Sequence, residues 1–302
     1  MLPRFRHLSI LAALPLLALI LFHGPLRAAE DDFGLLVMAH GGSPEWNASV
    51  HAAVAPLSKA FRVEVAFGMA DADSLQEAVA TLEARGARRI GVIRLFIDGA
   101  SFRQRTEEIL GLRPGAAPRE DDFQPPAHSM ATYRIASTAS FALVPDGLNV
   151  APEVDRVIFD RARALSESPE SETLVLIAHG AGDPASNARL EALMIDRARL
   201  AEQELGLRRV VALTLAEDWE ALRAVQERAV RATVAAASDG DGTAIVVPFR
   251  LSGFGPYHDI LAGLDFHADG TGLLPHPAIG AWLRRQVDEL AEASFRYPDH
   301  PE

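Results

Sequence analysis

Two histidines stand at the same point of two similar segments of the chain. Each follows a run of apolar residues and directly precedes a glycine; they are His40 and His179. An imidazole nitrogen binds divalent metal ions and exchanges protons near neutral pH, so either position could serve one of these roles. For one such histidine alone, a packed ring bonded to a neighbouring carbonyl is the simpler interpretation. The presence of a histidine at the same point of both segments favours a role in chemistry, although a structural role inherited by both segments would give the same pattern.

A third histidine, His258, comes after a glycine-rich segment with several aromatic residues. The segment follows an apolar run that ends at Phe249, and it contains Arg250, Phe254 and Tyr257. Backbone N–H groups in such loops can bind anions, but the spacing matches neither a Walker loop nor a dinucleotide-binding fingerprint. The sequence therefore predicts no nucleotide cofactor.

An acidic pair, Glu217 and Asp218, follows another apolar run. A carboxylate whose pKa is tuned by burial can accept protons in a reaction, and Glu217 is the first candidate for this role. A solvated acid in the first turn of a helix, favoured there by the helix dipole, explains Glu217 almost equally well. Both interpretations stay open.

These residues must be positioned by a regular fold, and the sequence indicates which one. Short apolar runs alternate with amphipathic helical segments, which is the pattern of parallel sheets buried on both faces. Ligands bind beyond the carboxyl ends of the strands in such sheets, and His40 and His179 fall there. The predicted strands are residues 34–39, 62–67, 89–97, 139–144, 173–178, 209–215 and 243–249.

An internal repeat divides the chain into halves. In both halves His-Gly is followed by the string Pro-x-x-Asn-Ala, which begins at Pro44 and at Pro184. Ser43 and Asp183 precede these prolines, and a capping residue before a proline predicts the start of a helix. The fold is therefore predicted as α/β with two similar lobes, each a mostly parallel sheet flanked by helices. The predicted lobes are residues 29–170 and 171–302.

The composition of the chain limits the number of domains, the partners and the kinds of metal ligand that we expect. The chain has 302 residues, a net charge of −12 and no cysteine. Its length suits two domains of ordinary size, and its negative charge argues against nucleic acid as a partner. The lack of cysteine excludes disulfides and thiolate metal sites, so histidine, aspartate and glutamate are the available strong ligands.

Residues 1–28 have the pattern of a secretory signal peptide. Arg4, Arg6 and His7 begin it, residues 10–22 are apolar, and residues 26–28 resemble a small-residue cleavage site. The apolar stretch is shorter than the roughly 20 residues of a bilayer span, and no second one follows. We therefore expect a periplasmic or secreted protein without a stable membrane span after cleavage. An uncleaved anchor is the alternative.

The motifs together resemble a known family. The strands that end in His-Gly, the Pro-x-x-Asn-Ala helix starts and the Val-Pro-Phe strand before the His258 loop resemble the class II tetrapyrrole chelatases. Within that family the resemblance is to the sirohydrochlorin cobaltochelatases and ferrochelatases of cobalamin and sirohaem synthesis. It covers nearly all of the chain after the signal and implies a two-lobed chelatase fold.

The resemblance also implies a metal site. Its ligands would be His179 and His258, and His40 is the only match in the first lobe. The corresponding first-lobe loop, residues 95–102, has no histidine, which suggests that this lobe serves as a wall or cap. Family members often carry a glutamate after the second strand, where this chain has Glu217 and Asp218, and the loop before His258 is about two residues longer.

The implied activity is the insertion of Co²⁺ or Fe²⁺, as the substrate metal, into a sirohydrochlorin-type tetrapyrrole. Phe254 and Tyr257 would face the macrocycle and Arg250 would pair with a substrate carboxylate, although loop packing and surface charge explain these residues as well. Sirohydrochlorin is made in the cytoplasm, so export favours a second hypothesis, a carrier of haem, tetrapyrrole or metal without turnover. A scaffold without metal is the third. His276, between two prolines, is a further ligand candidate.

Overall fold

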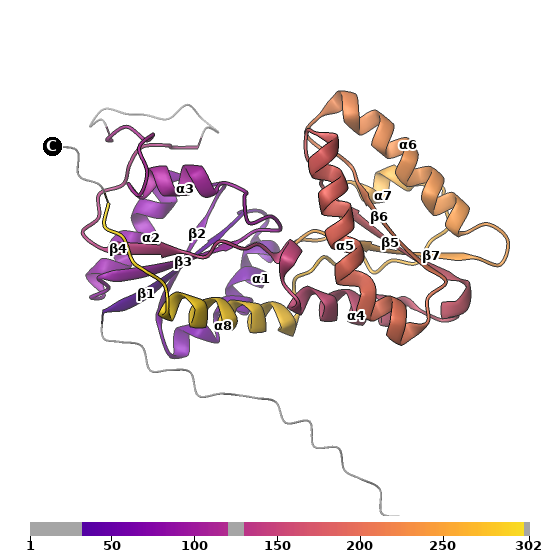
Figure 1. Ribbon diagram of the computed structural model, residues 1–302, viewed down its shortest axis with the longest axis horizontal. Coiled ribbons are helices and arrows are strands. Elements are labelled where there is room, and N and C mark those ends of the chain that lie inside the picture. Colours follow the sequence, from indigo (N-terminus) through magenta and orange to yellow (C-terminus); the bar gives the residue numbers. More distant parts are fainter. Residues whose placement is uncertain (1–31, 120–129, 299–302) are drawn as a thin grey trace, which may run out of the picture.

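The computed structural model describes residues 32–119 and 130–298. The predicted signal peptide, residues 1–28, lies outside the described residues. No helix in the described part of the chain combines the length and the apolar character that crossing a membrane requires. Figure 1 shows two groups of strands side by side, which correspond to the two predicted lobes.

The seven strands form two fully parallel sheets. The first sheet has the order β2-β1-β3-β4, and its strands are β1 (Phe33–Ala39), β2 (Arg62–Phe67), β3 (Arg89–Leu95) and β4 (Ser140–Leu143). The second has the order β6-β5-β7, and its strands are β5 (Glu172–Ala178), β6 (Arg209–Thr214) and β7 (Thr243–Pro248). Every predicted strand is confirmed, with each end within two residues of its predicted position.

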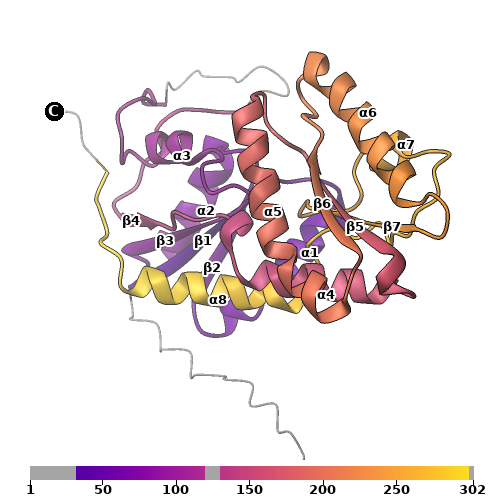
Figure 2. The same cartoon turned by 45° about the vertical axis from the view of Figure 1, so that its right-hand side comes forward.

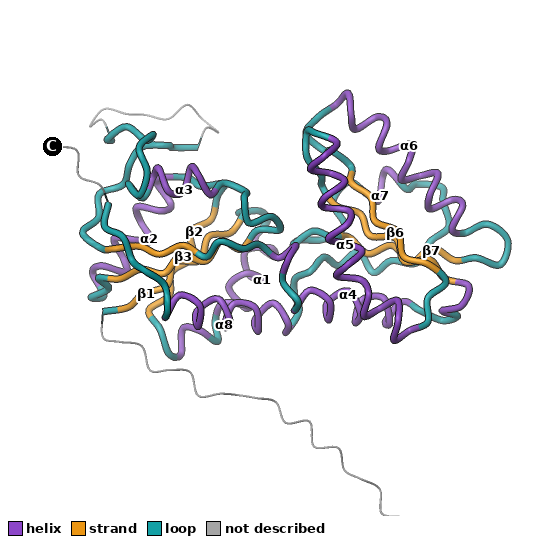
Figure 3. Tube along the Cα trace, in the orientation of Figure 1, coloured by secondary structure: helices purple, strands orange, loops and turns teal. Residues whose placement is uncertain are grey.

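Helices cover both faces of the two sheets (Figure 3). The longer ones are α1 (Pro44–Val54), α2 (Ala72–Ala84), α3 (Arg103–Ile109), α4 (Glu153–Leu165), α5 (Pro184–Leu205), α6 (Glu220–Ala237) and α8 (Pro277–Ala291). The short ones are α7 (Tyr257–Ile260) and the 3₁₀ helices Leu57–Lys59, Leu148–Val150 and Pro169–Ser171. The two predicted helix starts are confirmed, since Ser43 accepts a hydrogen bond from the Trp46 amide and Asp183 from the Ser186 amide.

Two helices cross between the lobes. The last helix, α8, packs against β3 and α1 of the first lobe, whereas α4 packs against α5 and β7 of the second. The two helices also contact each other along one side of the molecule (Figures 1 and 2). The first sheet lies within the predicted lobe 29–170 and the second within 171–302, while α4 and α8 each pack mainly against the sheet or helices of the other half; the boundaries themselves stay a prediction.

This crossing joins the lobes through one hydrophobic core. Phe33 of β1, Leu176 of β5 and Leu290 of α8 belong to the same cluster of buried side chains. Two smaller clusters cover the opposite faces of the two sheets. Because burial of apolar surface is the main stabilising contribution, each lobe is stabilised by a helix that the other half of the sequence supplies.

Candidate metal-binding site

The repeated histidines have the same local geometry. Nδ1 lies 3.0 Å from the backbone oxygen of the following glycine at both His40 and His179. A carbonyl oxygen only accepts hydrogen bonds, so this contact assigns the proton to Nδ1. The lone pair of Nε2 is then free for a metal ion, as in many metal-binding histidines, where the second ring nitrogen donates to a carbonyl.

The Pro-x-x-Asn-Ala string holds the loop that follows each histidine. In the second lobe, Asn187 is nearly fully buried, accepts a hydrogen bond from the Ala181 amide at 2.6 Å and donates to the Ala181 oxygen at 3.0 Å. In the first lobe, Asn47 accepts from the Gly42 amide at 3.1 Å. The repeated asparagine thus has a structural role that the sequence reasoning did not assign.

A carboxylate faces the free nitrogen of His179. Nε2 lies 3.3 Å from Oδ2 of Asp218, which follows the neighbouring strand β6. The two side chains are 41% and 74% exposed, so solutes can reach both. With its proton on Nδ1, the ring has no hydrogen to donate to Asp218, and the contact needs either a second proton or a shared cation. Two ligand atoms bound to one ion at about 2.1 Å lie about 3 Å apart, which this spacing matches.

Glu217 belongs to a separate, more buried network. Its Oε1 accepts hydrogen bonds from the Arg250 guanidinium and, at 3.3 Å, from the Tyr257 hydroxyl. Arg250 also lies over the Tyr257 ring, 5.6 Å from its centroid. Burial, followed by the negative charge of Glu217, raises the pKa of Tyr257, so its hydroxyl stays protonated. The network joins the loop after β6 to the loop after β7.

These contacts bear on three expectations about the substrate. Tyr257 is completely buried, so the expectation that it faces a macrocycle is wrong for this conformation. Its ring packs edge-on against Phe254, which stacks on Phe266 at 6.1 Å, and the expected contact of Phe254 with a macrocycle stays a prediction. Arg250 already has Glu217 as an ionic partner, and its pairing with a substrate carboxylate stays a prediction.

The third histidine has a different neighbour from His179. His258 lies on α7, is 86% exposed at its side chain and contacts Asp259 at 3.3 Å. Within the described residues, no three histidine, aspartate or glutamate side chains are grouped so as to hold a metal ion. The pairing of His179 with His258 therefore stays a prediction. His276 has a structural role instead, because its Nδ1 caps α8 by accepting the Ala278 amide at 3.1 Å.

An arginine occupies the matching place in the first lobe. Arg94 of β3 pairs with Met38, and Pro248 of β7 pairs with Ile177. Both partners stand two residues before the repeated histidine, so Arg94 and Pro248 are equivalent positions of the repeat. The sequence reasoning missed Arg94, whose only signal was a charge within an otherwise apolar run.

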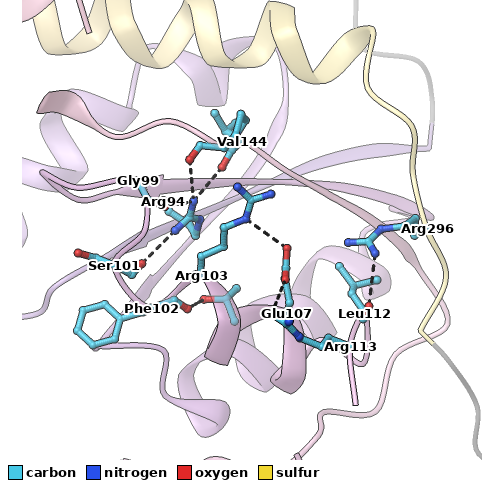
Figure 4. A network of polar contacts seen from close by, with 12 residues as sticks. Arg94, Gly99, Ser101, Phe102, Arg103, Glu107, Leu112, Arg113, Val144 and Arg296 are labelled. Carbon is cyan, nitrogen blue, oxygen red and sulfur yellow. Dashed lines mark hydrogen bonds and ion pairs between the residues drawn. The ribbon is translucent and has the colours of Figure 1, made fainter. Parts of the chain in front are cut away.

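Arg94 ties down the loop that would carry a metal ligand. The side chain is 1% exposed, and it donates to the backbone oxygens of Gly99, Ser101, Val144 and Pro145 at 2.7–3.2 Å. Figure 4 shows the Arg94 guanidinium among Gly99, Ser101 and Val144. A fixed positive charge beneath this loop disfavours a bound cation, which is consistent with the expectation that the first lobe acts as a wall or cap.

Comparison with known proteins finds a family match in the first lobe and a shared fold over most of the chain. Residues 34–143 match the CbiX family model. SirB from Bacillus subtilis with Fe³⁺ has the same fold, with a TM-score of 0.58 and 16% identity over 86% of this chain and 96% of that chain. The sirohydrochlorin chelatase SirB from Bacillus subtilis subspecies spizizenii, in complex with cobalt, gives a TM-score of 0.57 and 13% identity over the same shares. No curated protein matches the chain in sequence. The family match therefore covers residues 34–143 of the first lobe, and the likeness to the two SirB structures shows a shared fold over 86% of the chain.

Proposed function

We propose that this protein inserts a divalent metal ion, Co²⁺ or Fe²⁺, into a sirohydrochlorin-type tetrapyrrole. The observation that carries the proposal is the contact between His179 Nε2 and Asp218 Oδ2 at the carboxyl edge of the second sheet. The CbiX match and the fold shared with two SirB structures support the same reaction class.

The reaction needs a site that holds the metal weakly enough to release it. The ion must lose part of its water shell, pass to the ring nitrogens and displace two pyrrole protons. A neutral imidazole and a carboxylate suit Fe²⁺ and Co²⁺, and a site with few protein ligands leaves positions open for exchange. In this proposal His179 and Asp218 hold the ion on the protein, and His258 approaches it as a further ligand.

Glu217 is the proposed acceptor of the two pyrrole protons, which it takes up one at a time and releases to water, and its ion pair with Arg250 offers a competing structural role. A proton-accepting role predicts that Glu217→Gln lowers kcat about 10²-fold or more in the folded protein, beyond any effect of Arg250→Met, while Co²⁺ affinity stays near wild type. A purely structural role predicts a different pattern, in which Glu217→Gln and Arg250→Met lower the melting temperature together and kcat falls only with the folded fraction.

A carrier function is the second candidate, and the predicted signal peptide favours it. Export would separate the protein from a cytoplasmic supply of sirohydrochlorin, and a carrier would use the same fold and metal site without turnover. We propose export to the periplasm or the medium. Cell fractionation should find the protein there, and full-length protein retained in the cytoplasm would contradict this part of the proposal.

An insertion assay separates the two candidates. Purified protein is mixed anaerobically with Co²⁺ and metal-free sirohydrochlorin, and product formation is followed by absorbance. An enzyme gives many turnovers per chain, and His179→Ala removes them. A carrier gives one equivalent of bound ligand and no turnover. If His179→Ala changed neither metal insertion nor Co²⁺ binding, both candidates would fail, and a scaffold with this fold would be the interpretation that is left.

A further inference from the structure

Trp219 lies beside the candidate metal-binding pair. It follows Asp218 directly and precedes α6, and the residue is 41% exposed. The other two tryptophans, Trp46 and Trp282, are buried. An indole ring has a large apolar face, so keeping one in water next to charged and polar groups is unfavourable unless the face has a partner for part of the time.

The indole ring is held in place by its surroundings. The Trp219 amide donates to the Ala216 oxygen at 3.0 Å, and the Trp219 oxygen accepts the Arg223 amide at 2.8 Å, which fixes the start of α6. The ring lies against the backbone of Gly182, where a Cβ atom would stand 2.3 Å from the indole nitrogen. A larger residue at position 182 would displace the indole ring from this position, so the loop after His179 leaves room for the ring.

The ring orientation is the informative observation. The indole and the His179 imidazole have centroids 6.2 Å apart and planes inclined at 84°. An imidazole that binds a metal at the centre of a macrocycle through Nε2 stands perpendicular to the macrocycle plane. A second ring perpendicular to that imidazole meets one necessary condition for lying parallel to the macrocycle, as stacking requires.

We propose that Trp219 is the stacking surface for the tetrapyrrole macrocycle while the metal is held at His179. This inference rests on the proposed function and assigns a substrate-binding residue that the sequence motifs did not indicate. The ligand class is a planar, metal-free tetrapyrrole, because a ring much wider than an imidazole is needed to reach from a metal on His179 to the neighbouring indole.

The test measures macrocycle binding and metal binding separately. Uroporphyrin, a metal-free tetrapyrrole, is titrated into the full-length protein and followed by its Soret band, and Co²⁺ alone is titrated by calorimetry. Stacking on one aromatic side chain predicts that Trp219→Ala raises the Kd for uroporphyrin about tenfold, and that Trp219→Phe restores most of the affinity. Co²⁺ affinity should stay unchanged in both variants. Val225→Ala, which removes another exposed apolar side chain of α6, is the matched control and should change neither Kd.

The outcomes separate this inference from the proposed function. Unchanged uroporphyrin affinity in Trp219→Ala overturns the inference and leaves the proposed function standing. Parallel losses of uroporphyrin and Co²⁺ affinity in both Trp219 variants also overturn it, since Trp219 would then only support the loop. A wild-type protein that binds Co²⁺ but no uroporphyrin contradicts the tetrapyrrole substrate itself and the inference with it.

Discussion

The two lobes have the same framework and use their polar residues differently. Each has a central strand that ends in His-Gly, a capped helix and an asparagine that holds the loop between them. In the second lobe, Asp218 is exposed and faces the repeated histidine. In the first, Asp71 caps α2 by accepting the Ser74 amide and also accepts the Ala131 amide, both at 3.0 Å.

The loops after the third strands differ in the same way. In the first lobe a buried guanidinium, Arg94, fastens the loop through four carbonyl groups. In the second lobe the equivalent loop leads to His258, which is exposed. The comparison teaches that the first lobe uses Asp71 and Arg94 for internal hydrogen bonds, whereas the second lobe leaves the equivalent Asp218 and the later His258 exposed to solutes.

Removal of Arg94 should give the largest effect on stability. Arg94→Met leaves several buried carbonyl groups without a donor, and we expect a loss of about 3 kcal/mol in the free energy of unfolding. Urea denaturation measures this loss. Arg103→Met is the control, because Arg103 is 43% exposed and makes an i,i+4 pair with Glu107 that contributes little. Equal stability of the two variants would contradict a structural role for the Arg94 network.

The two aspartates should separate metal binding from stability. Asp218→Ala is expected to weaken Co²⁺ binding about 10- to 100-fold and to leave the melting temperature unchanged. Asp71→Ala should remove a helix cap and cost about 1 kcal/mol of stability without affecting Co²⁺. Calorimetric titration and thermal unfolding of both variants test the pair. A metal effect at Asp71, or none at Asp218, would break the comparison between the lobes.

The smallest expected effect concerns the helix that crosses between the lobes. Burial, followed by the nearby charge of Arg161, lowers the pKa of His276 from its usual 6.5. The unfolded chain therefore takes up this proton more readily than the folded chain. The stability contributed by His276 is complete above about pH 6.5 and falls as the pH drops toward the lower folded pKa.

A substitution isolates this dependence on pH. Protonation of His276 Nδ1 abolishes its bond to the Ala278 amide, whereas asparagine caps helices at any pH. The melting temperature of His276→Asn should therefore fall less between about pH 7.5 and 5.5 than that of wild type. The difference should correspond to less than about 1 kcal/mol in the free energy of unfolding. His51→Asn, on α1, serves as a control. An unchanged pH profile in His276→Asn would rule out this role.

The sheets could be predicted because their strands are continuous apolar runs, and the helix starts because Ser43 and Asp183 carry strong local signals. The packing of α4 and α8 against the opposite lobes could not be predicted. Both helices have an apolar stripe, and a stripe alone does not specify which sheet it covers. Among the site residues, the positions of His40 and His179 followed from the repeat. The choice of Asp218 rather than Glu217 as the partner of His179 depends on side-chain directions in one turn, which neither composition nor spacing specifies.

The central claim is that the second lobe, and not the first, holds the metal ion. A calorimetric Co²⁺ titration of His179→Ala and His40→Ala tests it. The two variants remove the equivalent histidine from the second and the first lobe. We predict near wild-type binding in His40→Ala and a loss of at least about tenfold in His179→Ala. The reverse order, or an equal loss in both variants, would contradict the account.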